Sequence, residues 1–79
     1  MRVKLRLFAT YRQYLPSKIE GNTIEVEVET GTRVSDLMSL YEIPIGADSV
    51  ILVNGITPRL NDQVNEGDVV SVFPAMAGG

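Results

Sequence analysis

The sequence predicts a small α+β domain in which a single main helix packs on one face of a sheet. Residues 2–8 and 23–29 alternate strictly between apolar and polar side chains, as half-buried strands do. Residues 31–41 are the one segment that carries apolar side chains at helical spacing over a useful length. Two apolar runs, 50–53 and 69–73, complete the pattern, so we expect four to five strands around one helix.

The first two strands are complementary in charge. The outward row of the first strand is basic and that of the second is acidic: Arg2, Lys4 and Arg6 against Glu25, Glu27 and Glu29. If the strands pair in antiparallel fashion, these rows lie side by side, and each cross-strand pair contributes about 0.2–1 kcal/mol. We interpret the charges as structural complementarity, with a docking surface as the alternative.

The next two elements are a turn and the helix. Residues 9–16 are too short for a packed helix and end in Pro16, which predicts a turn or a single helical turn. In the helix over 31–41, Thr32 or Ser35 is expected to be the N-cap, and Asp36 favours the first turn. Its buried face is predicted to consist of Val34, Leu37, Met38 and Tyr41.

The carboxyl-terminal half predicts three further strands. Residues 50–53 form an apolar run, and Asn54-Gly55 supplies a two-residue hairpin turn. We expect a short strand over 56–58, with Leu60 tucked under the following loop. A turn at Gly67 then leads into the last strand, 69–73.

The composition argues against an enzyme with a pocket of its own. The chain has 79 residues, no cysteine and no histidine. A domain of this size buries only about 60–65% of the surface of its unfolded chain, which leaves little room for a deep cavity. Acid–base chemistry near neutral pH would need retuned carboxylates or lysines. We therefore predict a protein that is not an enzyme and binds no metal or cofactor itself.

Charge and hydropathy limit the classes of partner that we expect. The formal net charge of −3 provides no positive field to attract a phosphate backbone, so nucleic acid is not an expected partner. No stretch resembles a signal peptide or reaches membrane-spanning length. Together with the absence of cysteine, this predicts a cytoplasmic protein with no membrane partner.

The carboxyl-terminal residues carry the strongest functional signal. After Phe73 the chain reads Pro74-Ala75-Met76-Ala77-Gly78-Gly79, and the side chains shrink to nothing. We predict a domain over 1–73 and a flexible tail over 74–79 that extends by up to about 20 Å. A carboxylate that must enter another protein's narrow site benefits from having no Cβ near the reacting carbon. A frayed terminus is the alternative explanation.

Several motifs resemble those of one family. They are Leu7-Phe8-Ala9, residues 34–40, Val53-Asn54-Gly55, and the run from Gly67-Asp68 through Phe73-Pro74 to the final Gly-Gly. Together they are similar to the β-grasp, ubiquitin-like sulfur carriers, most of all the small subunit of molybdopterin synthase (MoaD-like and ThiS-like proteins). The family's tail often has Pro-Pro after the phenylalanine, where this chain has Pro74-Ala75.

The resemblance implies a mixed β-grasp sheet and a two-stage function. A ubiquitin-activating-type adenylyltransferase (MoeB-like or ThiF-like) would use ATP and magnesium to adenylate the Gly79 carboxyl group, which then becomes a thiocarboxylate. Gly78 would allow passage of the tail into the active site. The charged carrier would then donate its sulfur to an acceptor such as the large subunit of molybdopterin synthase, for the molybdenum or tungsten cofactor.

The last strand also suggests where partners bind. Alternation puts Val70 and Val72 on one face and Val69, Ser71 and Phe73 on the other, outer face. We predict that Phe73 docks partners together with Pro74, Ala75, Met76 and Ala77, with edge packing as the alternative for Phe73. Either Leu52 or Val53 would extend this patch, and periodicity does not distinguish them.

Other functions remain open at this point. A protein modifier that forms isopeptide bonds would use the same Gly-Gly end. The sulfur could instead go to thiamine thiazole, cysteine or tRNA thiolation. A plain interaction domain with an accidental Gly-Gly end is the remaining alternative to a carrier, and an independent catalyst ranks last.

Overall fold

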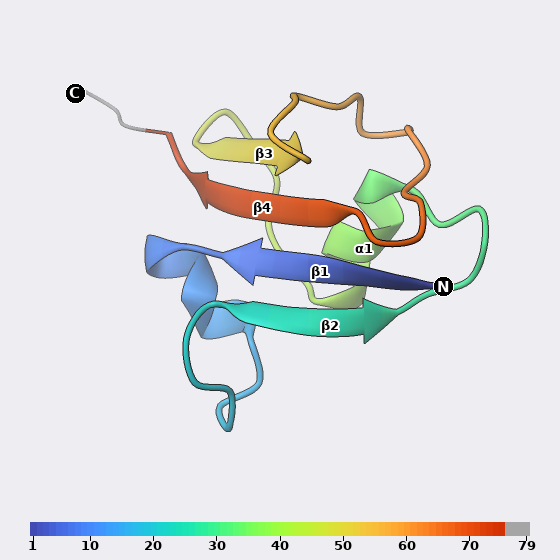
Figure 1. Cartoon of the computed structure of the whole chain (residues 1–79). Coiled ribbons are helices and arrows are strands. Elements are labelled where there is room, and N and C mark those ends of the chain that lie inside the picture. The colour runs from blue at the N-terminus through green and yellow to red at the C-terminus, as the bar shows by residue number, and fades with distance from the viewer. Residues whose placement is uncertain (76–79) are drawn as a thin grey trace.

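Four strands form one mixed sheet, in the order β2-β1-β4-β3 (Figure 1). The computed structural model describes residues 1–75. The strands are β1 (Arg2–Leu7), β2 (Thr23–Glu27), β3 (Ser49–Val53) and β4 (Val69–Pro74). The central strands β1 and β4 are parallel, and both outer pairs are antiparallel. With the helix α1 (Val34–Leu40) packed against one face, this is the predicted β-grasp arrangement.

The β1–β2 pair matches its predicted charge pattern. Arg2 stands opposite Glu27 and Lys4 opposite Glu25. The Arg2 and Glu27 side chains form an ion pair at 3.8 Å between Nε and Oε1, well exposed to solvent. Such exposed pairs contribute little to stability, about 0–1 kcal/mol. Arg6 stands opposite Thr23, so the acidic row ends before it reaches this arginine.

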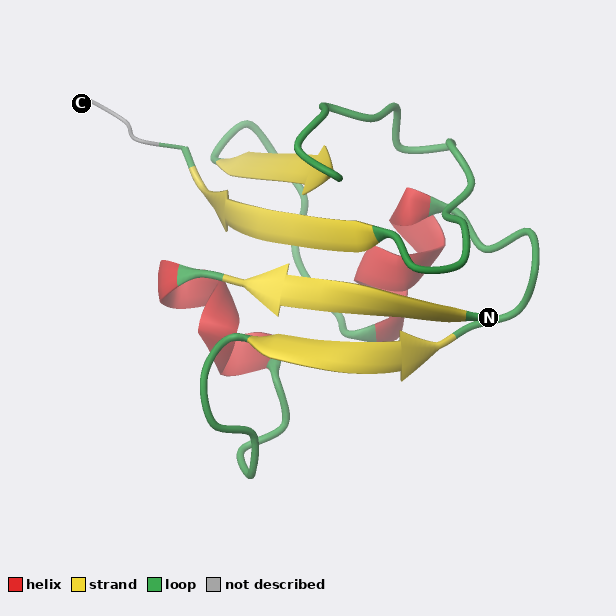
Figure 2. Cartoon of the chain, in the orientation of Figure 1, coloured by secondary structure: helices red, strands yellow, loops and turns green. Residues whose placement is uncertain are grey.

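The core lies between the sheet and the two helical segments. Figure 2 shows α1 behind the strands and the 3₁₀ helix η1 (Ala9–Tyr14) at the end of the sheet where β1 stops. The turn predicted over 9–16 is therefore confirmed as a short 3₁₀ helix. The fully buried side chains come from β1, α1, β4 and the loop before β4: Val3, Leu5, Leu7, Val34, Leu37, Met38, Val64, Val70 and Val72. One face of the sheet is thus covered, and the other is open.

The predicted helix cap is wrong. Arg33, and neither Thr32 nor Ser35, is the N-cap of α1, and its backbone N–H donates to the Asp36 carboxylate at 3.0 Å. The N–H of Val34 donates to the carbonyl of Asp62, and that of Ser35 to the carbonyl of Leu60, both at 2.9 Å. Because a distant loop satisfies these first helical donors, no hydroxyl cap is needed.

The short strand predicted over 56–58 does not form. Only a single bridge joins Val53 and Ile56 around the Asn54-Gly55 turn, where φ is 53° and 83°. The chain then turns to bring the Leu60 and Asp62 carbonyls to the start of α1. The side chain of Leu60 consequently lies outside, 44% exposed, and is not tucked under the loop as predicted.

Strand β4 runs one residue further than predicted, to Pro74. Pro74 stands opposite Ser49, while Ala75 N–H donates to the Asp48 carbonyl at 2.8 Å and Asn54 N–H donates to the Val69 carbonyl. Hydrogen-bonded and non-bonded pairs alternate in an antiparallel ladder, so Ser49–Pro74 is a non-bonded pair. The missing N–H of proline therefore breaks no hydrogen bond to β3.

Within residues 1–75, no helix has the length and apolar character needed to cross a membrane.

Candidate functional site

The outer face of β4 is half-buried and partly apolar. Val70 and Val72 are completely buried beneath the sheet, whereas Val69, Ser71 and Phe73 stay partly exposed on the opposite face. This confirms the predicted division of the strand. The outer face therefore presents Phe73 at the end of the strand, next to the chain's last residues.

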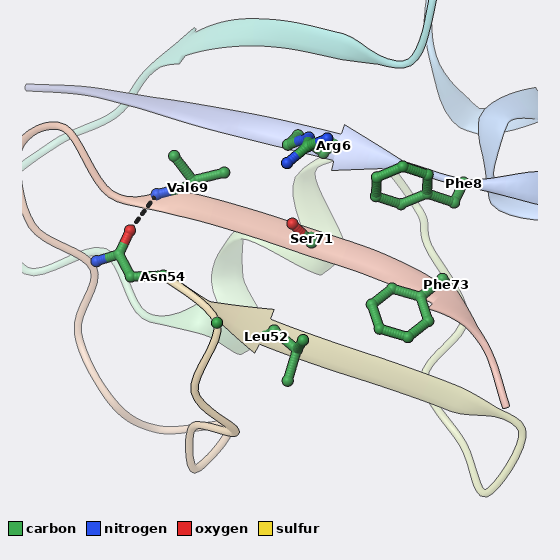
Figure 3. Close-up of a pocket in the computed structure, with 8 residues that line it drawn as sticks. Arg6, Phe8, Leu52, Asn54, Val69, Ser71 and Phe73 are labelled. Carbon is green, nitrogen blue, oxygen red and sulfur yellow. Dashed lines mark hydrogen bonds between the residues drawn. The ribbon is translucent and has the colours of Figure 1, made fainter.

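A shallow hollow of about 440 Å³ lies on this face, and we call it the sheet hollow. Its lining comes from β1, β4, β3 and the turn after β3: Arg6, Phe8, Leu52, Asn54, Gly55, Val69, Ser71 and Phe73. Figure 3 shows the labelled side chains standing on the same side of the sheet, with α1 behind it. Because the sheet hollow is shallow, it does not enclose a small molecule as typical ligand pockets do.

Two aromatic rings form one end of the sheet hollow. The rings of Phe8 and Phe73 meet edge to face, with centroids 6.0 Å apart and planes at 83°. The parallel register sets Arg6 beside Ser71 and Leu7 beside Val72, which brings the following residue, Phe8, alongside Phe73. Such aromatic pairs are favourable by about 0.5–1.5 kcal/mol beyond their burial. Phe73 is thus held in place while part of its surface remains open.

One cation borders this apolar surface. The guanidinium carbon of Arg6 lies 5.0 Å from the centroid of the Phe8 ring. Its cross-strand neighbours are Thr23 on β2 and Ser71 on β4. Among residues 1–75, no carboxylate lies within ion-pair distance of Arg6. The sheet hollow therefore combines apolar walls with one positive charge that these residues leave unneutralised.

The register of β3 decides between Leu52 and Val53. Leu52 stands opposite Ser71 and lines the sheet hollow, whereas Val53 stands opposite Val70 and packs against the core. Leu52 is therefore the residue that extends the patch around Phe73.

The turn after β3 is tied to the start of β4. The Asn54 side chain accepts a hydrogen bond from the Val69 N–H through Oδ1, and it donates to the Asp68 carboxylate through Nδ2, both at 2.9 Å (Figure 3 shows the first). These bonds fix the wall of the sheet hollow that faces away from Phe73.

The family model of the ThiS family matches residues 5–79. The chain belongs to the ThiS family. This confirms the resemblance to ubiquitin-like sulfur carriers that the motifs predicted.

Several solved structures are similar to this ThiS-family protein. The putative molybdopterin converting factor, subunit 1, of Pyrococcus furiosus is 31% identical over 92% of this chain and 95% of its own, with a TM-score of 0.76. The Haloferax volcanii HVO 2177 protein is 26% identical over 100% of this chain and 87% of its own, at 0.79. Small archaeal modifier protein 1 of Haloferax volcanii is 18% identical over 92% of this chain and 95% of its own, with a TM-score of 0.74. At this identity the similarity shows the shared fold alone.

The predicted site residues of this ThiS-family protein fall into two groups. Phe73 lines the sheet hollow, and Pro74 and Ala75 continue from it along the edge of β3. Met76, Ala77, Gly78 and Gly79 lie outside the described residues. Within the described residues, no group of three or more acidic, histidine or cysteine side chains is arranged to hold a metal ion.

Sequence reasoning missed Phe8 and Arg6. The alternation of β1 does put both on the outer face, since they follow Arg2 and Lys4 in the same row. Only the parallel pairing of β1 with β4, two segments more than sixty residues apart in the chain, reveals that they adjoin Phe73.

Proposed function

We propose that this ThiS-family protein is a sulfur carrier for molybdopterin synthesis, with its reactive group at the Gly79 carboxyl. The observation that carries the proposal is the ThiS-family match, which extends to Gly79. The choice of pathway is supported by the 31% identity to a protein described as a putative molybdopterin converting factor, subunit 1.

The proposed chemistry has two steps at one carbon. A carboxylate oxygen of Gly79 attacks the α-phosphorus of ATP, which gives an acyl-adenylate and releases pyrophosphate. A hydrosulfide ion then attacks the carbonyl carbon, and AMP leaves with the former carboxylate oxygen. Where the donor is a persulfide, the same attack gives an acyl disulfide, and a second thiol of the donor cleaves its S–S bond to leave the thiocarboxylate on Gly79 and a disulfide on the donor. The activating adenylyltransferase supplies ATP and magnesium, so the carrier contributes the carboxyl group and no catalytic side chain.

Gly78 and Gly79 suit this chemistry because neither has a Cβ. An incoming sulfur nucleophile meets no side chain next to the reacting carbonyl, and the backbone is free to adopt angles closed to other residues. Once the sulfur has bonded to the acceptor's substrate, water attacks the acyl carbon and the C–S bond breaks, which leaves the sulfur on the substrate and regenerates the Gly79 carboxylate for another cycle.

The sheet hollow is the proposed docking site for the activating enzyme. The Phe73 end of the sheet hollow lies where β4 leads into the last residues, so a partner bound there is close to the reactive end. Phe73, Phe8 and Leu52 would receive an apolar side chain. Pro74 and Ala75 would contact the partner from their place beside β3, and Met76 and Ala77 would guide the end of the chain into its active site. The unneutralised Arg6 favours a partner that places an acidic side chain at the rim.

The proposal is tested by the mass of the protein. The chain ending at Gly79 is incubated with ATP, magnesium, a sulfur donor and a MoeB-like or ThiF-like activating enzyme. We expect an intact-mass gain equal to the replacement of one oxygen by sulfur, and no gain for a chain that lacks Gly78 and Gly79. An unchanged mass with every such enzyme would contradict the carrier role.

The acceptor is tested separately. The thiocarboxylated protein is mixed with the large subunit of molybdopterin synthase and its sulfur-free substrate, and dithiolene formation is measured. Transfer to a thiazole, cysteine or tRNA system instead would reassign the pathway. Proteins in a lysate that carry a Gly-Gly remnant on lysine would identify the chain as a protein modifier.

A further inference from the structure

The last described residues belong to the folded domain. Ala75 N–H donates to the Asp48 carbonyl at 2.8 Å, and Pro74 stands opposite Ser49. Both Pro74 and Ala75 are half-buried. The chain is therefore still held against the edge of β3 two residues beyond Phe73.

The strand edge that holds Pro74 and Ala75 is itself fixed by its neighbours. The Ser49 hydroxyl lies 2.5 Å from the hydroxyl of Tyr11, and it donates to the Pro44 carbonyl at 3.3 Å. The Ser49 N–H donates to the Gly46 carbonyl at 3.0 Å. Tyr11, on η1, is buried, with 8% of its surface exposed. The end of β4, η1 and the segment before β3 all lie at the same end of the sheet (Figure 1).

These contacts link residues from three parts of the chain into one unit. We call this unit the carboxyl-terminal anchor; it consists of Tyr11, Asp48, Ser49, Pro74 and Ala75. Its outermost bond requires a backbone N–H at position 75. A proline at this position would have no N–H and could not make this bond.

We propose that the anchor sets the length of chain that delivers the Gly79 carboxyl to the activating enzyme, with Tyr11 and Ser49 as positioning residues. This inference rests on the proposed function. From the anchor to the end is four residues, which span at most about 14 Å, against about 20 Å for the six residues after Phe73. The distance from a partner docked on the sheet hollow to the Gly79 carboxyl is then limited to a defined length. Misplacing a reacting group by about 1 Å can lower a rate on the order of a hundredfold.

The first test needs no partner. Amide hydrogen exchange of the free protein is measured by NMR, with the Lys4 amide as the internal control because it donates to the Asp68 carbonyl at the same 2.8 Å, at the other end of β4. We expect the Ala75 amide to exchange about five- to tenfold more slowly than in an unstructured peptide. Exchange of Ala75 at the peptide rate would overturn the anchor.

The role of Tyr11 is tested in the same experiment. Tyr11→Phe keeps the buried ring and removes the hydroxyl that meets Ser49. We expect faster exchange of the Ala75 amide and an unchanged rate for Lys4. Equal acceleration of both amides would mean that Tyr11 acts only through the overall stability of the domain, which would overturn its positioning role.

The second test measures reach. Ala75→Pro removes the N–H donor, and Ala75→Ser keeps it as the matched control. Deleting Ala77 shortens the end by about 3.4 Å. In the wild type and in Ala75→Ser, we expect the deletion to lower kcat/KM for thiocarboxylation by at least about tenfold. In Ala75→Pro, the chain is no longer bound to Asp48, so the residues freed from β3 make up the lost length. The same deletion should then lower kcat/KM by less than about threefold.

The two proposals fail in different ways. An equal cost of the Ala77 deletion in all three backgrounds would overturn the length-setting role, even if every variant is thiocarboxylated. If no variant is thiocarboxylated, the wild type included, the proposed function fails, and the Ala75 exchange rate still decides whether the anchor exists.

Discussion

At the scale of single residues, Phe73 connects the fold to the proposed function. Its ring is braced by Phe8 and lies where the folded sheet passes into the chain's last residues. Bracing matters because an aromatic side chain that is already ordered loses little conformational freedom on binding. The outer-face position of Phe73 follows from alternation along β4, whereas the contact of Phe8 and Arg6 with the same surface follows from a long-range strand pairing that no local pattern reveals.

We expect Phe73→Ala to weaken docking far more than it weakens the fold. Removing a central aromatic side chain from an interface commonly costs about 2 kcal/mol or more, so KM for activation should rise by about thirtyfold. Leu40→Ala is the control, since Leu40 is 61% exposed on α1 and lies outside the sheet hollow. Steady-state kinetics with the activating enzyme measure both variants. An equal KM for the two would remove the sheet hollow from the docking site.

Arg6 supports a second prediction at this scale. Arg6→Gln should raise KM several-fold and flatten its dependence on ionic strength, because a charge at the rim of an interface acts mainly on encounter with an oppositely charged partner. Lys4→Gln, on the same strand and face but outside the sheet hollow, is the control. KM titrations between low and high salt measure the effect. A salt dependence unchanged by Arg6→Gln would mean that the partner places no acidic group there.

At the scale of elements, local pattern sufficed wherever a segment's own periodicity decides its structure. The alternating strands and the Asn54-Gly55 turn are of this kind, and so is the helix, which was predicted over 31–41 and is observed over Val34–Leu40. The errors arose where another part of the chain takes over a hydrogen bond. The carbonyls of Leu60 and Asp62 accept the hydrogen bonds that a hydroxyl cap on α1 would otherwise accept. With its carbonyl directed at the helix, Leu60 has its side chain exposed to solvent. Neither effect leaves a mark on spacing or composition.

The Asn54 turn shows how one element stabilises the next. Asn54 has φ of 53°, and its side chain bonds both the Val69 N–H and the Asp68 carboxylate. Asn54→Ala removes these hydrogen bonds and places at positive φ a residue that adopts the left-handed conformation less readily than asparagine. We therefore expect the free energy of unfolding to fall by about 1–3 kcal/mol. Urea denaturation measures this, with the exposed Asn61→Ala as control. Equal midpoints for the two variants would contradict a stabilising role for the turn.

At the scale of the whole molecule, the two faces of one sheet have separate tasks. The inner face, with α1, provides the stability of a chain of 79 residues, whereas the outer face carries the sheet hollow. A domain this small has only a modest stability reserve. Because the apolar docking residues lie on the outer face, substitutions there change partner binding while the packing of the core beneath the inner face is kept.

This separation is itself testable with Met38→Ala. Met38 is completely buried on α1, so its truncation should lower the free energy of unfolding by about 2–5 kcal/mol. At a temperature where the variant remains folded, KM for activation should match that of the wild type, because no part of the sheet hollow has changed. Phe73→Ala should show the reverse pattern, with KM raised about thirtyfold and the free energy of unfolding lowered by only about 1–2 kcal/mol, because the half-buried ring loses its contact with Phe8. If Met38→Ala raised KM as much as Phe73→Ala does, the docking face would depend on the core packing beneath it, and the two faces would act as one unit.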